Sequence, residues 1–199
     1  MDSARFSFPA VKGIQANMEY YITMVPLDCI TKLFTFSDEN MAPEIRSQRT
    51  LNKSRIPEMS NYILQNPKSY VFSALAASVD GEIKFEPSSP ENSNLGMLSI
   101  SISSRLLIND GQHRCAAIEA ALKKNPDLKY EHISIVLYHD IGLKRSQQMF
   151  SDLNRFAIRP TQSLNILYDS RDSLSLIVKE IIDAIPGFSK LIDKEHTSI

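Results

Sequence analysis

The stretch LLINDGQHRCAAIEAAL, residues 106–122, places an apolar, β-type run directly against an alanine-rich run. Residues 105–109 are typical of a strand, and Asp110-Gly111 is a turn signal. A helix is predicted over 112–124, and it ends before Asn125-Pro126 because proline cannot continue a helix. Alanines at positions 116, 117, 120 and 121 would let this helix pack closely on a sheet. The stretch therefore predicts an α/β fold.

The turn inside this stretch has the chemistry of an anion site. The start of a helix presents free N–H groups and about half a positive charge. A guanidinium suits bidentate phosphate contact, and a carboxylate can cap the first turn. We expect Gly111, Gln112, His113 and an outward-pointing Arg114 to bind a phosphate or nucleotide, with Asp110 as the N-cap. The alternative is an ordinary capped turn, in which His113 is a structural hydrogen-bonding residue and Arg114 is solvated.

Elements of both types are predicted around this stretch. Strands are predicted over 20–25, 97–102 and 133–138, and a hairpin is predicted from 70–78 through Asp80-Gly81. Residues 86–94 are typical of a surface loop. Helices are predicted over 143–156, after Pro160 and at the C-terminal side, where one apolar stripe consists of Leu174, Ile177, Val178, Ile181, Ile182 and Ile185. We expect this stripe to need a packing partner in a C-terminal part that the sequence lacks.

Composition narrows the class of protein. With 199 residues, 43% hydrophobic and 23% charged, the chain is typical of a globular domain. A net charge of -1 argues against a strongly basic nucleic-acid binder, so DNA would need a local patch. The two cysteines, Cys29 and Cys115, predict neither a disulfide framework nor a zinc site, and they favour a reducing cytoplasm. We expect no signal peptide and no membrane span, and we assign no metal-ligand residues, while a divalent metal cofactor stays open.

One segment supplies such a patch. Arg46, Arg49, Lys53 and Arg55 occur within ten residues that contain no acid, a local charge of +4. If the segment is helical, the first three share one face. This face would neutralise DNA phosphates, although charge runs are also common on merely solvated surfaces.

The string DGQHR, residues 110–114, is the signature of the DGQHR-domain family. Residues 48–81, 106–122 and 147–172 resemble, in this order, the DndB family of regulatory proteins from bacterial DNA phosphorothioation systems. This resemblance implies a repressor of its own modification operon, with double-stranded DNA and other proteins of the system as partners. It also implies a DGQHR domain over 1–165 and the beginning of a helical region over 166–199.

The DGQHR domain is in turn similar to the ParB and sulfiredoxin group. That similarity implies a mixed sheet flanked by helices, with Gly111, His113 and Arg114 against the phosphate of a nucleotide such as ATP or CTP. Sulfiredoxin has its catalytic cysteine directly after the glycine, where this chain has Gln112. Cys115 lies three positions later, where the helical register turns it inward, so we expect it in the core.

A second polar pattern lies further along the chain, at 151–163. The resemblance implies that Asn154, Pro160 and Ser163 close the site, and an amide and two guanidiniums beside a proline-fixed turn would suit a phosphate chain or DNA. The alternative is that the amide caps the helix and the arginines are solvated. The polar residues that would form or extend this face are Asn154, Arg155, Arg159 and Ser163, with Lys144, Arg145, Gln147 and Gln148.

Two functions of different classes remain open, a repressor and a nucleotide-dependent enzyme. The enzyme would be an NTP hydrolase or a DNA-nicking nuclease. Asp110 would bind a divalent ion or orient water, His113 would transfer protons and Arg114 would stabilise phosphoryl charge. A scaffold for the modification complex and a homo-oligomer are further expectations. Neither a helix-turn-helix nor a Walker loop is recognisable in the sequence.

Overall fold

The computed structural model describes residues 4–34, 52–139, 148–149, 151–153, 155, 166 and 168–188. The chain divides into two compact units, Met1–Arg155 and Phe156–Ile199. The division between residues 165 and 166 that the resemblance implied stays a prediction.

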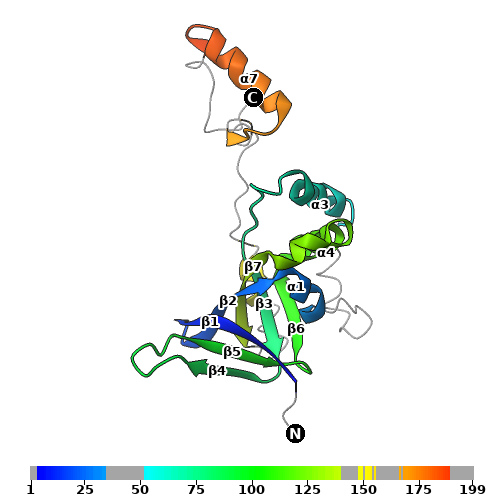
Figure 1. Cartoon of the computed structure of the whole chain (residues 1–199). Coiled ribbons are helices and arrows are strands. Elements are labelled where there is room, and N and C mark those ends of the chain that lie inside the picture. The colour runs from blue at the N-terminus through cyan, green and yellow to red at the C-terminus, as the bar shows by residue number, and fades with distance from the viewer. Residues whose placement is uncertain are drawn as a thin grey trace. The chain divides into compact units, whose positions relative to one another are not determined.

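The first unit is built on a seven-stranded mixed sheet of order β4-β5-β1-β2-β7-β3-β6 (Figure 1). Only β3 and β7 are parallel, and every other neighbouring pair is antiparallel. The strands are β1 (Arg5–Gln15), β2 (Met18–Pro26), β3 (Leu75–Asp80), β4 (Ile83–Pro87), β5 (Leu95–Ser101), β6 (Arg105–Asp110) and β7 (His132–His139).

Helices accompany this sheet, so the predicted mixed sheet flanked by helices is confirmed. They are α1 (Leu27–Leu33), α3 (Arg55–Gln65), α4 (Gln112–Lys124) and the short 3-10 helix η2 (Pro126–Tyr130). The bounds of α4 agree with the prediction, and α4 packs against both α1 and α3. The buried face of α4 consists of Cys115, Ala117, Ile118 and Ala121. The short alanine side chains let α4 pack close to the neighbouring helices.

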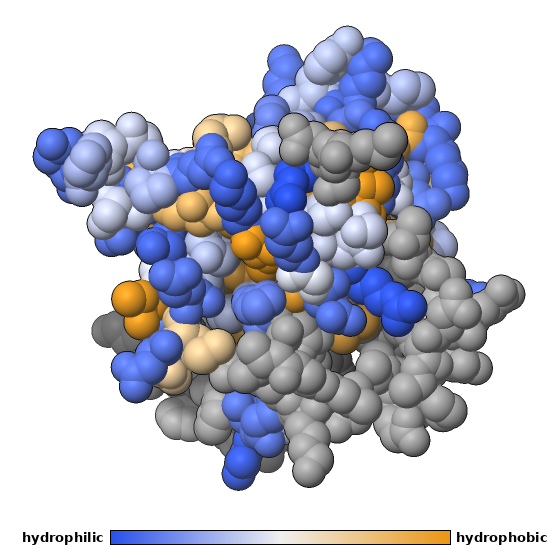
Figure 2. Space-filling model, turned by 90° about the horizontal axis from the view of Figure 1, so that it is seen from below, coloured by the Kyte–Doolittle hydropathy of each residue, from blue (hydrophilic) through white to orange (hydrophobic). Residues whose placement is uncertain are grey.

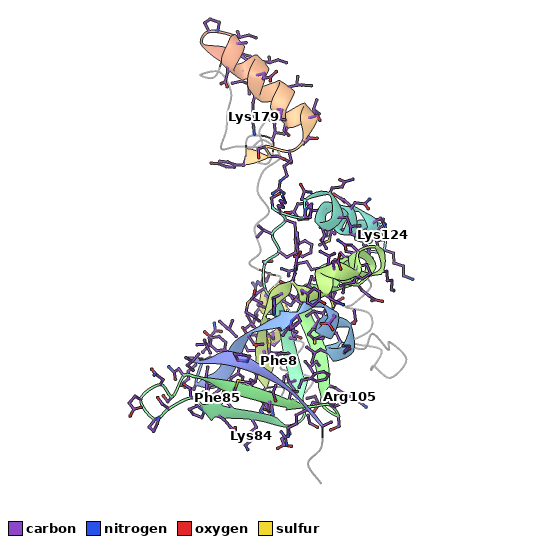
Figure 3. All side chains as sticks on the ribbon, in the orientation of Figure 1. Phe8, Lys84, Phe85, Arg105, Lys124 and Lys179 are labelled. Carbon is purple, nitrogen blue, oxygen red and sulfur yellow. The ribbon has the colours of Figure 1, made fainter. Side chains whose placement is uncertain are left out.

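The core follows the burial pattern of the strands. Along β2, Tyr21, Thr23 and Val25 are buried while the residues between them face outward, as expected for a sheet covered on one face. Along β3, every residue from Leu75 to Val79 is buried, so both faces of this strand are covered. Phe8 and Phe85 lie where β1, β4 and β5 run together (Figure 3), and the Phe85 ring contacts that of Tyr21 at 5.5 Å between centroids.

The hairpin predicted at Asp80-Gly81 is wrong. Asp80 pairs with Arg105, and Ile83 pairs with Ile100, so β3–β4 and β5–β6 together form one long antiparallel ribbon that bends at Gly81. Gly81 has φ +143°, and a Cβ there would lie 2.3 Å from Ser104 Oγ, so the bend requires glycine. The chain reverses instead between β4 and β5, within the stretch predicted as a surface loop.

The strand predicted from residue 70 begins only at Leu75. The N–H of Tyr70 is donated to the Asn66 carbonyl at 2.9 Å, and that of Val71 to the Tyr62 hydroxyl at 2.9 Å. These bonds hold residues 67–74, the connector between α3 and β3, outside the sheet.

The second unit contains α7 (Ser173–Ala184), which coincides with the predicted amphipathic helix. Asp172 caps it by accepting from the N–H of Ser175 at 2.8 Å. The apolar stripe is largely open to solvent: Leu174, Ile177, Ile181 and Ile185 are between 47% and 67% exposed. On the face of the molecule in Figure 2, by contrast, hydrophilic residues predominate and hydrophobic ones form small separate patches.

No helix within the described part of the chain is long and apolar enough to cross a membrane.

Candidate functional site

The turn between β6 and α4 depends on Gly111. It is the N-cap of α4 and has φ +98°, in the left-handed region that favours glycine. A Cβ at this position would lie 2.4 Å from Cδ2 of the buried Leu75 and 3.0 Å from Arg114 Nη2. The predicted capping role of Asp110 is wrong, because its carboxylate binds the Arg114 guanidinium instead. A glycine N-cap carries no side chain that could accept from the first N–H groups of α4.

Arg114 does not point outward as predicted, but folds back over the turn. Its Nη2 donates to Asp110 Oδ2 at 2.7 Å. Its Nη1 donates to the carbonyl of Ser73 at 3.0 Å and to the hydroxyl of the same residue. The guanidinium side chain is only 13% exposed, against 47% for the carboxylate. Arg114 therefore fixes the end of the connector to the start of α4, and the carboxylate offsets its charge.

His113 joins the start of α4 to the segment before α3. Its Nε2 accepts from the backbone N–H of Asn52 at 3.0 Å, which requires the neutral imidazole. Burial, and then the positive charge of Arg55, lower the pKa of His113 below its usual value of 6.5. This contact places part of the basic cluster, Lys53 and Arg55, beside the DGQHR turn, and both side chains are exposed.

A buried polar group lies directly beneath the turn, and sequence reasoning missed it. Asn109, the last residue before DGQHR, is 2% exposed, and its amide donates to Ser78 Oγ at 2.5 Å and to Met149 Sδ at 3.2 Å. A buried amide with satisfied donors fixes the end of β6 against β3. An asparagine ending an apolar run is a signal that could have identified it. Nothing in the sequence indicates the partners, which lie 31 and 40 residues away.

Two residues of the second polar pattern are described. Arg155 is exposed and belongs to a helical segment, and Gln148, also exposed in a helical segment, donates to Asp152 Oδ1 at 2.7 Å. The remaining members of the basic cluster and of the second polar pattern lie outside the described residues: Arg46, Arg49, Lys144, Arg145, Gln147, Asn154, Arg159, Pro160 and Ser163. Of the predicted residues, the structure therefore brings together the DGQHR turn, Lys53 and Arg55.

Cys115 belongs to the core, as predicted. It is fully buried, and burial, with a further contribution from Glu119, raises the pKa of its thiol to about 12. A thiol of this kind is not a nucleophile at neutral pH. Within the described ranges, no three His, Cys, Asp or Glu side chains come together as metal ligands.

The chemistry available at the start of α4 is thus electrostatic. It consists of a helix N-terminus without a capping side chain, two exposed cations and a neutral imidazole, on a turn fixed by Gly111 and Arg114. Such an arrangement can bind phosphate groups by charge and by N–H donors.

Comparison with known proteins identifies one family. Residues 8–199 match the family described as DndB, DNA-sulfur modification-associated. Neither the curated proteins nor the solved structures contain a match. The match spans nearly the whole chain and agrees with the resemblance of residues 48–81, 106–122 and 147–172. The chain therefore belongs to the DndB family of DNA-sulfur-modification-associated proteins.

Proposed function

We propose that this protein is a DNA-binding regulator that represses a DNA-sulfur-modification operon, and that it contacts DNA phosphates at the start of α4. One observation carries the proposal. The Asn52 N–H to His113 Nε2 bond brings the exposed Lys53 and Arg55 to the uncapped helix start, although the two segments are 61 residues apart in sequence. Cations and free N–H groups that converge on one surface are the usual phosphate-binding elements of DNA-binding proteins.

The local potential supports this placement. Arg55 contributes to the lowered pKa of His113, which is the effect expected where positive charge gathers. Arg114 adds little to the field at this surface, because Asp110 lies 2.7 Å from its guanidinium. We therefore assign phosphate contact to Lys53, Arg55 and the first N–H groups of α4, and assign to Arg114 the positioning of the turn.

The test is the salt dependence of binding to duplex DNA from upstream of the modification operon. Fluorescence anisotropy across a salt series gives the slope of log affinity against log salt, to which each phosphate contact contributes about 0.9. Lys53→Glu together with Arg55→Glu should lower this slope by about 2 and weaken all DNA sequences alike. Because both positions are exposed, the double variant should unfold at the same urea concentration as the wild type.

The matched control reverses Lys124 and Lys129. Lys124 is exposed at the far end of α4 (Figure 3), and Lys129 is exposed in η2. The change in net charge is therefore the same, but the surface differs. The control should keep the wild-type slope. Equal slopes in the wild type and the Lys53/Arg55 variant would move the DNA surface elsewhere. A repressor should also bind the upstream region more tightly than unrelated DNA, and equal affinity would argue against regulation.

The N–H groups at the start of α4 would equally suit the phosphates of a nucleotide. ATP and CTP are therefore titrated alone and in competition with DNA. A nucleotide bound here should displace DNA in the wild type. If neither nucleotide alters the affinity for DNA, nucleotide and DNA do not share this site.

A further inference from the structure

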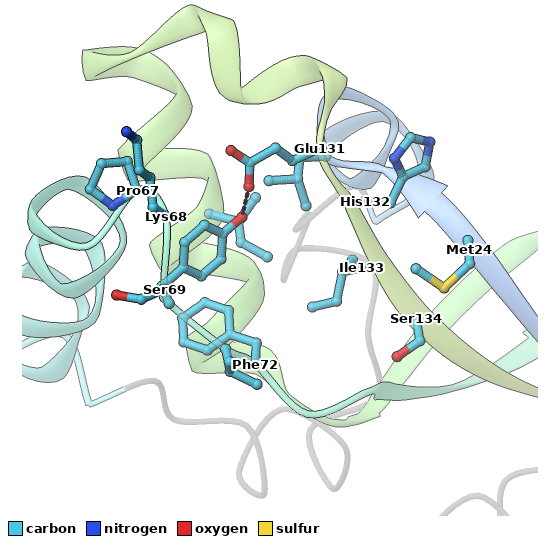
Figure 4. A pocket seen from close by; sticks show the side chains of 13 residues that line it. Met24, Pro67, Lys68, Ser69, Phe72, Glu131, His132, Ile133 and Ser134 are labelled. Carbon is cyan, nitrogen blue, oxygen red and sulfur yellow. Dashed lines mark hydrogen bonds between the residues drawn. The ribbon is translucent and has the colours of Figure 1, made fainter. Parts of the chain in front are cut away.

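A pocket of about 400 Å³ is lined by the connector, β2, β7 and Ile118 of α4, and no residue of the DGQHR turn belongs to its lining. Figure 4 shows Phe72 on one side of the pocket and Ile133 of β7 on the other. Tyr70 joins Phe72 in the lining, and Met24 of β2, which pairs with Ser134 and so points to the opposite face of the sheet from Ile133, also lines the pocket. The volume falls in the range of small-molecule sites, about 300–1,000 Å³. Its two apolar walls leave a slot between aromatic rings and aliphatic side chains.

The aromatic wall is held in place before any ligand arrives. The ring of Tyr62 in α3 contacts that of Phe72 at 5.9 Å between centroids and that of Tyr70 edge-on at 6.5 Å. Its hydroxyl accepts the N–H of Val71 at 2.9 Å. A wall fixed by packing and hydrogen bonds loses little conformational entropy when it binds a ligand.

One end of the slot is polar. The Tyr70 hydroxyl donates to Oε2 of Glu131 (Figure 4). Burial, and then this carboxylate, raise the pKa of Tyr70, so the hydroxyl remains a donor. The other oxygen of Glu131 has no hydrogen-bond donor among the described side chains, and Ser134 and His132 add further polar atoms to the lining.

These features select a ligand class. The rings of Tyr70 and Phe72 are inclined by 71° to each other, so a flat ring can stack on one of them while the other presents its edge. The open carboxylate oxygen of Glu131 can accept N–H donors on the edge of that ring and disfavours an anionic ring. We propose that this pocket binds a nucleobase, as part of a nucleoside or nucleotide. The site is separate from the proposed DNA surface, and its occupancy does not depend on DNA binding.

The test is isothermal titration of the full chain with adenosine, guanosine and cytidine, with ribose as the ligand that lacks a base. At least one nucleoside should bind, and ribose should not. Met24→Glu, which places a charge in the lining of the pocket, should weaken binding by about fivefold or more. Glu131→Gln, which keeps the shape but loses the charged acceptor, should also weaken it by about fivefold.

The matched control is Met97→Glu. Met97 is 42% exposed on β5 and Met24 is 52% exposed on β2, but only Met24 lines the pocket. Met97→Glu should bind like the wild type, and both methionine variants should keep the wild-type unfolding midpoint. The proposal is overturned if no nucleoside binds, or if Met24→Glu and Glu131→Gln bind as tightly as the wild type. Loss of DNA binding alone would refute the regulator and leave the nucleobase site standing.

Discussion

Replacing Gly111 with alanine should destabilise the first unit by about 2–5 kcal/mol. Two costs contribute. A non-glycine residue at φ +98° costs about 1–2 kcal/mol. The new Cβ would also lie 2.4 Å from Cδ2 of Leu75, which is fully buried and cannot move without repacking, at about 1–3 kcal/mol. Urea unfolding followed by far-UV circular dichroism measures the loss.

A double-mutant cycle separates the two costs. Leu75→Val removes Cδ2 and should itself cost about 1 kcal/mol. In that background Gly111→Ala should cost only the backbone strain, about 1–2 kcal/mol. An equal cost in both backgrounds would refute the steric argument, and a cost below about 0.5 kcal/mol in both would refute the need for glycine as well.

Four further outcomes are expected. Arg114→Ala should lower the free energy of unfolding by about 1–3 kcal/mol, because it removes charge-assisted bonds to Asp110 and Ser73; an unchanged urea midpoint would show that the clamp is not stabilising. Asn109→Ala should lower the free energy of unfolding by about 1–3 kcal/mol, since it leaves the buried hydroxyl oxygen of Ser78 without the N–H donor of Asn109; calorimetry measures this loss. Because the pKa of His113 is lowered in the folded state, this residue contributes stability that is present above its unfolded pKa of 6.5 and is lost as the pH falls from that value through the folded pKa. Urea titrations from about pH 8 to about pH 5 should therefore show a smaller loss of unfolding free energy in His113→Gln than in the wild type. Ile181→Glu in the exposed stripe of α7 should leave the unfolding midpoint unchanged and reduce any concentration-dependent association seen by sedimentation velocity.

Local sequence signals predicted the elements that depend on local chemistry. The ends of α4 and the stripe of α7 follow from proline, alanine and apolar spacing, and both agree with the structure. The Asp80-Gly81 dipeptide was wrongly interpreted as a hairpin turn. The same dipeptide can form a bend when the strands on either side pair with strands distant in sequence, and a short stretch of sequence does not reveal such pairing.

The candidate site shows the same limit. The sequence identified the DGQHR turn and its basic neighbours, but not what the side chains contact. Arg114 was expected in solvent, because Ser73, which accepts its bonds, lies 41 residues earlier. The bond from Asn52 to His113 spans 61 residues, and no periodicity or motif connects them.

The position of β7 has a consequence for how the chain is made. β7 is the last of the described strands in sequence, yet it fills the place between β2 and β3, antiparallel to one and parallel to the other. While the ribosome has released only the residues before His132, both neighbours keep an unpaired edge, and such edges recruit strands from other chains. A pause in translation that keeps β7 inside the ribosome should therefore favour aggregation of the nascent chain, whereas a pause after β7 has left the ribosome should not.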